Sequence, residues 1–300
     1  MQVAISGASG LIGSALAESL RADDHVVRPL VRADSADPQA IRWDPMAGTI
    51  DAASLEGVDA VVHLAGAGIG DHRWTAAYKQ TLLESRTKGT GLIARTLAEL
   101  DQPPRVFICG SAVGFYGDAG DQVVNESSPA GEGFLADVVV AWEQAAAPAQ
   151  AAGIRTVLAR SGIVLTRRGG SLRKMLLLFR LGLGGPFGSG KQWISWITLT
   201  DEIAALRLLI DREDIAGPVN LAAPEAVTNK AFSRALGRAL HRPAVVPTPR
   251  FGPALILGRE FVDQVLFVSQ RVEPAVLIKA GYDFVHPDID RGMQGALVDR

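Results

Sequence analysis

A glycine-rich turn directly after the first apolar run constrains this chain more than any other feature. The stretch ISGASGLIG places Gly7, Gly10 and Gly13 between a strand-like segment and a helical pattern. This spacing permits a tight turn, a close approach of a phosphate to the backbone, and close packing of helix on strand. The first N–H groups of such a helix carry partial positive charge and suit a pyrophosphate. The context predicts a dinucleotide-binding loop, although an ordinary glycine-rich turn has the same composition.

Short apolar runs alternate with longer helical patterns through the first half of the chain. The strand-like runs are QVAIS, HVVRPLV, DAVVHLA, RVFICG and IRTVLAR, with PVNLA further along. Apolar strands separated by amphipathic helices indicate a parallel sheet that is covered on both faces. We therefore predict an α/β fold with a Rossmann-like, doubly wound parallel sheet. This domain is expected to span residues 1–242, with a smaller substrate lobe mainly within 166–242 and a small helical domain at 243–300.

Composition and charge restrict the partners of the chain. The formal net charge of −2 disfavours nucleic acid, and no stretch approaches the roughly 18 apolar residues of a membrane span. The lone Cys109 lies in an apolar run, which favours a buried structural thiol and a reducing compartment. The strand-like run at the first residues leads us to expect no leader segment. We expect a cytoplasmic monomer or homodimer that takes a small-molecule substrate and binds neither nucleic acid nor membrane.

The end of the second predicted strand discriminates between the nicotinamide cofactors. An acidic residue at this point would accept hydrogen bonds from the adenosine ribose and repel a 2′-phosphate. The stretch HVVRPLVRADS instead has Arg32 at its tip and Arg28 within the strand. A guanidinium can hold a phosphate with two hydrogen bonds, so the sequence favours NADP(H) over NAD(H). The alternative is an ordinary surface arginine.

Several motifs together resemble one family. SGASGLIG, DAVVHLAGAGI, GSAVGFYGD, ARSGIVL and WITLTDEIAAL are similar to an extended short-chain dehydrogenase/reductase. WDPMAG, FLADVVVAWE and GSGKQWISWI resemble its atypical branch of epimerase family proteins, an NAD-dependent epimerase/dehydratase-like group. The tail RVEPAVLIKAGYDFVHPDID resembles the small C-terminal domain of unknown function of that branch.

The resemblance assigns expected roles to individual residues. It implies that the cofactor is held by Gly7, Ser9, Gly10, Leu11, Ile12 and Gly13 at the pyrophosphate, Arg32 at the 2′-phosphate, Leu64, Ala65 and Gly66 past the ribose, and Gly162 and Val164 near the nicotinamide. No second histidine or carboxylate stands at ligand spacing from His63, so no metal is predicted.

The usual proton relay of the superfamily is missing from this sequence. That relay is a tyrosine followed four residues later by a lysine, which lowers the pKa of the phenol. The three tyrosines, Tyr78, Tyr116 and Tyr282, are followed at that spacing by leucine, glycine and histidine. The serine that would polarise the substrate oxygen falls at Ser111 or, without a gap, at Ala112.

Three explanations follow from the missing relay. Another group supplies the proton, with Ser111, Tyr116, Lys79 and Arg86 as the candidates. Alternatively, the chain binds NADP(H) without turnover, as a sensor or regulatory protein. In the third explanation the hydride moves and the substrate provides its own acid. The sequence thus indicates an oxidoreductase or nucleotide-sugar-epimerase-like enzyme of unknown substrate, or a non-catalytic NADP(H)-binding regulator.

A polar loop and the helix after it supply candidates for the substrate side. Arg73 and Trp74 follow the predicted HLAGAG strand end and are expected near the ligand crevice. Lys79 and Arg86 stand seven residues apart, so they share one helix face and are suited to a carboxylate or phosphate, unless that face is simply solvated.

The segment KQWISWITLTDEIAAL carries two further expectations. Trp193, with Trp196 facing the same way, is expected to form a wall over the nicotinamide or the substrate, or else to be a core contact between the lobes. The helix that follows is expected to take Thr200 as its N-cap.

Overall fold

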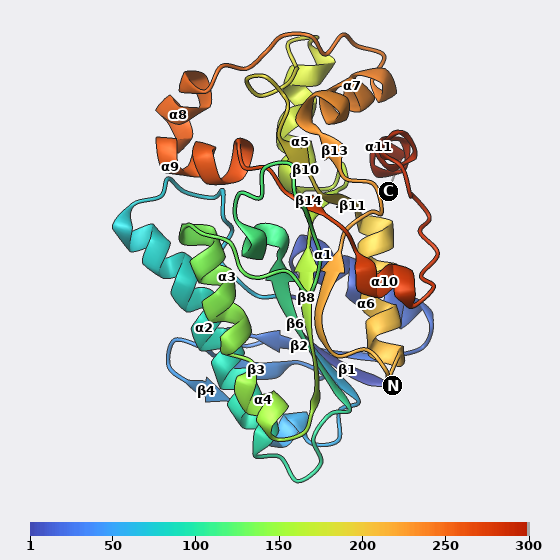
Figure 1. Cartoon of the computed structure of the whole chain (residues 1–300). Coiled ribbons are helices and arrows are strands. Elements are labelled where there is room, and N and C mark those ends of the chain that lie inside the picture. Colours follow the sequence, from blue (N-terminus) through green and yellow to red (C-terminus); the bar gives the residue numbers. More distant parts are fainter. Residues whose placement is uncertain (299–300) are drawn as a thin grey trace.

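The structure, a computed structural model, describes residues 1–298. An eight-stranded sheet forms its centre, with the strand order β12-β8-β6-β5-β1-β2-β3-β4 (Figure 1). Its strands are β1 (Gln2–Ser6), β2 (Val26–Val31), β3 (Ile41–Asp44), β4 (Thr49–Ile50), β5 (Ala60–His63), β6 (Val106–Ala112), β8 (Arg155–Ser161) and β12 (Gly217–Leu221). Neighbouring strands run parallel except for the antiparallel pair β3 and β4. The chain order reverses between β1 and β5, the place where open α/β sheets bind ligands.

Helices cover both faces of this sheet (Figure 1). They are α1 (Leu11–Ala22) and α6 (Leu199–Asp211) on one face, and α2 (Ala76–Ala98), α3 (Phe134–Gln144) and α4 (Ala147–Ala151) on the other. Strand alternation builds one core on each side, because Val3 and Ile5 pack under α1 and α6 whereas Ala4 packs under α2. This arrangement confirms the predicted Rossmann-like, doubly wound fold. Within residues 1–298, none of the helices combines the length and the apolar character needed to cross a bilayer.

A smaller lobe continues from the carboxyl end of β8 (Figure 1). It comprises β9 (Ile163–Leu165), α5 (Gly170–Arg180), β10 (Trp193–Ile194), β11 (Trp196–Thr198), β13 (Val227–Thr228) and α7 (Asn229–Ala239). Its core is built around Leu172, Trp196, Phe232 and Met293, all of them buried. Because Met293 lies in the last helix of the chain, the C-terminal segment takes part in the packing of this lobe.

The C-terminal segment is helical, with one short strand that the sequence did not reveal. Its elements are α8 (Phe251–Leu257), α9 (Arg259–Phe261), the π-helix η3 (Val262–Leu266), β14 (Arg271–Val272), α10 (Ala275–Lys279) and α11 (Ile289–Val298). β14 pairs in parallel with β7 (Val123–Val124), which follows the 3₁₀ helix η2 (Val113–Tyr116). A second 3₁₀ helix, η1 (Ala53–Leu55), precedes β5. The segment therefore returns across the carboxyl side of the sheet (Figure 1).

The predicted start of α6 is wrong by two residues. Thr198, and not Thr200, is the N-cap of this helix. The hydroxyl of Thr198 accepts the backbone N–H of Asp201 at 3.2 Å and donates to its carboxylate at 2.8 Å. Asp201, three residues after the cap, thus holds the Thr198 hydroxyl through both its side chain and its backbone N–H. Residue 203, three positions after Thr200, is an isoleucine, whose side chain cannot accept a hydrogen bond in this way.

The prediction that Trp193 and Trp196 face the same way is also wrong. Trp193 lies in β10 and pairs with β13, whereas Trp196 lies in β11 and pairs with β9. The indole N–H of Trp193 donates to Asp121 at 2.9 Å, and that of Trp196 donates to the Glu225 carbonyl at 3.0 Å. The backbone changes direction at Ser195, so Trp193 stays half-buried while Trp196 enters the lobe core.

Candidate functional site

The turn between β1 and α1 has room only for glycine at two of its three glycine positions. Gly7 has a φ of +72°, in the left-handed region that side chains rarely adopt. A methyl group on Gly7 would lie 2.9 Å from the backbone nitrogen of Ala65, and one on Gly13 would lie 2.2 Å from the carbonyl oxygen of Gly7. Gly10 is less restricted, with 3.2 Å to the same oxygen. The turn, the helix and the β5 loop are therefore in backbone contact.

The amino end of α1 is left open toward solvent. Its N-cap is Gly10, which offers no side-chain acceptor to the first N–H groups. The helices α2, α6 and α7 differ, because each begins at a threonine whose hydroxyl accepts a backbone N–H. Ser9 and Gly10 are exposed, and Leu11 and Ile12 are half-buried beside them. Uncapped, outward-facing N–H groups at a helix start are suited to an anion such as a pyrophosphate.

At the tip of β2, Arg32 is exposed and lies one residue beyond the strand. Within residues 1–298, no carboxylate lies at ion-pair distance from Arg32, because the nearby Asp34 pairs with Arg42 instead. Arg28 points elsewhere and donates to the carbonyl of Ser54. Of the two arginines in this strand region, Arg32 is the one whose guanidinium has no partner among residues 1–298.

The loop after β5 is anchored by a buried serine–histidine pair. The hydroxyl oxygen of Ser6 accepts the N–H groups of Leu64 and Ala65, at 3.2 and 3.3 Å. It also lies 2.5 Å from Nδ1 of His63, to which we assign the serine proton. Burial, with a smaller effect of the nearby Arg86, lowers the pKa of His63 to about 3, so the ring is neutral. The histidine therefore positions the Leu64–Gly66 strand end.

The two residues predicted to lie near the nicotinamide, Gly162 and Val164, follow the end of β8. Gly162 donates its N–H to the Leu221 carbonyl at 2.9 Å, and a methyl group on it would lie 2.9 Å from the carbonyl oxygen of Ser195. Val164 follows in β9, which pairs with β11. The hydroxyl of Ser161 donates to the carboxyl of Glu202 at 2.6 Å. Glu202 is fully buried, and its second carboxyl oxygen has no hydrogen-bond partner within residues 1–298.

Glu202 gives an expected pH dependence of stability. Burial raises the pKa of its carboxyl from 4.5 to about 8. Between these values the folded chain keeps a proton that the unfolded chain has lost, so the free energy of unfolding falls as pH rises. Above pH 8 the contribution is constant. We expect Glu202→Gln to remove this fall, which is a few kcal/mol in size, in thermal unfolding from about pH 5 to pH 8.

Comparing wild type with Glu202→Gln separates the contribution of Glu202 from that of His63. His63 contributes in the opposite direction, because its folded pKa of about 3 lies below the ordinary 6.5 and stability rises with pH between them. That contribution is common to wild type and Glu202→Gln. Parallel stability curves for the two proteins would show that Glu202 is ionised in the folded chain.

Two of the predicted proton donors belong to a closed buried network. Ser111 donates its hydroxyl proton to Glu143 at 2.6 Å, and Arg160 donates to both oxygens of the same carboxylate at 2.8 Å. The Tyr116 hydroxyl accepts from Arg160 at 3.0 Å and donates to the Asn220 side chain at 2.7 Å. Burial raises the pKa of Tyr116. Both hydroxyl protons are therefore already committed to protein acceptors.

The sequence reasoning missed Glu143, Arg160 and Asn220. Their signals were present, since Glu143 and Arg160 stand in the AWE and ARSG motifs that carried the resemblance. Nothing in the sequence pairs the two residues, because they come from α3 and β8 and meet only across the fold. The local indication of a carboxylate partner is an arginine that directly follows the apolar run VLA within β8.

The first turns of α2 contribute an aromatic and charged wall. Lys79 forms an ion pair with Glu260 at 2.6 Å and lies over the Phe134 ring. Trp74 packs edge-on against Phe134 and Phe261, with ring centroids 5.2 and 5.3 Å apart. Glu260 and Phe261 belong to the C-terminal segment, so this wall joins that segment to the start of α2.

The remaining substrate-side candidates are separated from one another. Arg73 lies beside Gly258, and Trp193 lies under the guanidinium of Arg271, 4.3 Å from the ring centroid. Arg86 faces α3, as Lys79 does, but it is buried and stacks 5.1 Å from the Trp142 ring centroid. Lys79 and Arg86 therefore share a helix face as predicted, but the Lys79 charge is already neutralised by Glu260.

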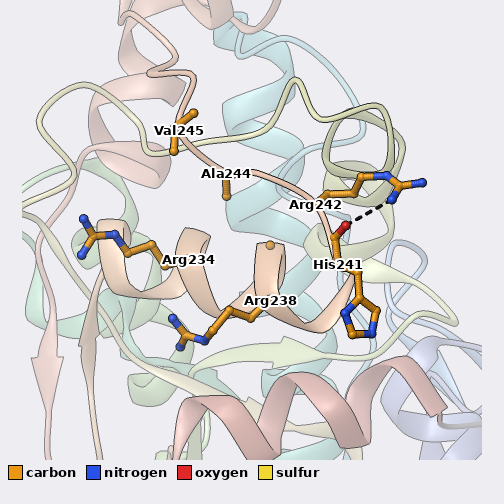
Figure 2. A pocket seen from close by; sticks show the side chains of 7 residues that line it. Arg234, Arg238, His241, Arg242, Ala244 and Val245 are labelled. Atoms are coloured by element: carbon orange, nitrogen blue, oxygen red, sulfur yellow. Dashed lines mark hydrogen bonds between the residues drawn. The ribbon is translucent and has the colours of Figure 1, made fainter.

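A cavity of about 470 Å³ lies away from these residues, along α7 (Figure 2). Arg234, Arg238, His241, Arg242 and Val245 line it, and Figure 2 shows the arginine side chains extending outward from the helix and the following turn. None of these residues comes from the carboxyl ends of the central strands. The cavity is thus distinct from the site formed by the glycine turn.

Two sequence profiles match the chain. The profile described as the NAD dependent epimerase/dehydratase family matches residues 3–222, and that of a domain of unknown function (DUF1731) matches residues 248–294. "Epimerase family protein MT2273" of Mycobacterium tuberculosis is 45% identical over 291 residues, which cover 97% of this chain and 96% of that protein.

Solved structures agree with these sequence matches. The human epimerase family protein SDR39U1, crystallised with NADPH, superposes with a TM-score of 0.89 at 34% identity and 99% coverage of both chains. The UDP-glucose 4-epimerase of Thermus thermophilus, in complex with NAD, has a TM-score of 0.75 at 18% identity, covering 99% of this chain and 97% of that chain, and it shares the fold. The chain belongs to the NAD dependent epimerase/dehydratase family, in the branch of the epimerase family proteins.

Proposed function

We propose that the chain is an NADP(H)-dependent oxidoreductase that acts on a small-molecule carbonyl or alcohol. The glycine turn carries this proposal, because only a chain without side chains at residues 7 and 13 can bring β1, α1 and the β5 loop into backbone contact. The uncapped N–H groups of α1 then suit the cofactor's pyrophosphate. The NADPH in the human SDR39U1 structure supports the same cofactor here.

Each part of the site has a proposed role toward the cofactor. The turn at residues 7–13 binds the pyrophosphate, Arg32 the 2′-phosphate, and the loop at residues 64–66 lies along the ribose. Gly162 and Val164 lie beside the nicotinamide. The bound cofactor supplies or accepts a hydride, and the protein holds the substrate's oxygen and excludes water.

The preference for NADP(H) gives a direct test at Arg32. We expect the wild-type chain to bind NADPH more tightly than NADH in calorimetric titration. Arg32→Ala should weaken NADPH binding by about 10- to 100-fold and leave NADH binding almost unchanged, because a charge-assisted pair to a phosphate is lost. Arg95→Ala, an exposed arginine on α2, is the matched control. Equal losses for both nucleotides would contradict the assigned role.

A specific observation favours a second function, that of a non-catalytic NADP(H)-binding regulator. The relay tyrosine and lysine are missing, and the hydroxyl protons of Ser111 and Tyr116 are committed to Glu143 and Asn220. Incubation with a panel of carbonyl compounds separates the functions. An oxidoreductase consumes NADPH in proportion to product, and an epimerase converts its substrate through a transient keto group without net consumption. A regulator binds NADPH and does neither.

A further inference from the structure

Arg86 is a buried cation without an anionic partner. Its side chain lies in the middle of α2, and the residue is 8% exposed. Its guanidinium makes one hydrogen bond, from Nη1 to the backbone carbonyl of Leu82 at 3.1 Å. Within residues 1–298, no carboxylate stands at ion-pair distance from it. Burial accordingly lowers the pKa of Arg86 to about 10.

A second buried arginine shows what a structural role requires. Arg160 is 3% exposed, and both oxygens of Glu143 accept its hydrogen bonds while the Tyr116 hydroxyl accepts a third. Charges are rarely buried without such pairing, because desolvation costs several kcal/mol per ion. Glu143, which follows Trp142 in α3, is engaged by Arg160, and Glu260 is engaged by Lys79. The fold therefore carries an uncompensated charge at residue 86.

The position of this charge relates it to the site. A methyl group on Gly66 would lie 3.5 Å from the Cζ of Arg86 and 3.6 Å from its Nη1. Gly66 belongs to the loop at residues 64–66, which contacts the glycine turn through Ala65 and Gly7. The other face of the guanidinium stacks on Trp142. The guanidinium of Arg86 therefore lies beside the loop at residues 64–66, which borders the proposed cofactor path.

We propose that Arg86 is the anion-binding residue of this site, holding a phosphate or carboxylate through the N–H groups that the protein leaves unused. The inference rests on the proposed function and deepens it. The anion comes from the dinucleotide phosphates or from an acidic group of the substrate. Arginine's planar fork suits both groups, because each presents two oxygens to parallel N–H donors.

The test uses the full-length chain with Arg86→Met and, as a matched control, Lys88→Met on an exposed turn of the same helix. The first measurement is thermal unfolding without ligand. Removing an uncompensated charge should leave Tm unchanged or raise it, whereas Arg160→Met should lower Tm because Glu143 loses its partner. A loss of Tm in Arg86→Met equal to that in Arg160→Met would assign Arg86 a structural role and overturn the proposal.

The second measurement identifies the anion. NADPH is titrated calorimetrically into each protein. The rise in Tm that inorganic phosphate or malonate gives to the NADPH-loaded protein is then measured. A 10- to 100-fold weaker NADPH affinity in Arg86→Met, absent in Lys88→Met, supports a cofactor phosphate. If NADPH affinity is unchanged in Arg86→Met but phosphate or malonate no longer raises its Tm, the anion is an acidic group of the substrate. If neither depends on Arg86, the proposal is overturned.

The two proposals fail in distinguishable ways. If the wild-type chain binds neither nucleotide, the proposed function fails. The rise in Tm with phosphate or malonate alone then still tests whether Arg86 binds an anion. If the wild-type chain binds NADPH and Arg86→Met matches it in every measurement, the function stands and the anion site does not. Arg86→Lys keeps the charge without the fork and should recover only part of the lost binding.

Discussion

Gly13→Ala should abolish most NADPH binding. The new methyl group would lie 2.2 Å from the carbonyl oxygen of Gly7, which belongs to the backbone and cannot rotate away. The turn would have to move by about 1 Å to restore an ordinary contact, and well-packed interiors absorb such shifts poorly. We expect affinity for NADPH to fall by about 100-fold or more and stability by about 1–3 kcal/mol, measured by calorimetric titration and urea unfolding.

Two other glycines calibrate this result. Gly252→Ala in α8 meets no atom within 4 Å, so it should leave NADPH binding and stability almost unchanged. Gly10→Ala meets the Gly7 oxygen at 3.2 Å and should have an intermediate effect. An affinity for NADPH in Gly13→Ala equal to that of Gly252→Ala would mean that the turn does not hold the nucleotide.

Arg160→Met should produce the largest loss of stability. It removes three hydrogen bonds and leaves the carboxylate of Glu143 buried beside Ser111 without its cation. Breaking a buried pair in this way costs about 3–5 kcal/mol, a large share of the ~5–15 kcal/mol that stabilises a domain. The free energy of unfolding in urea measures this loss.

An exposed arginine and a double variant serve as controls for Arg160→Met. Arg238→Met breaks an ion pair with Asp290 in which both side chains are more than half exposed, so little change is expected. Adding Glu143→Leu to Arg160→Met should restore part of the stability, because the buried charge is gone. A double variant that is less stable than Arg160→Met would show that the hydrogen bond from Ser111 to Glu143 outweighs the cost of the unpaired carboxylate.

Local patterns predicted the parts of the fold whose causes are local. The glycine spacing located the turn at residues 7–13, and the apolar runs located β1, β2, β5, β6, β8 and β12. The start of α6 is also encoded locally, in the three-residue spacing of Thr198 and Asp201, whereas the sequence analysis predicts the cap at Thr200.

Features that depend on distant partners could not be predicted. β14 is two residues long, and its pairing with β7 joins segments about half the chain apart. The ion pair of Arg160 with Glu143 and the unpaired state of Arg86 are equally properties of the assembled fold. In sequence, Lys79 and Arg86 are two equivalent cations on one helix face, and only the positions of Glu260 and Trp142 distinguish them.

The wall shared by α2 and the C-terminal segment has a consequence for how the protein is made. The turn at residues 7–13 leaves the ribosome well before Glu260 and Phe261, which meet Lys79 and Trp74. Chains fold from their amino end as they are synthesised. A nascent chain can therefore form the nucleotide turn early, but the wall between α2 and the C-terminal segment stays incomplete until that segment has also been synthesised.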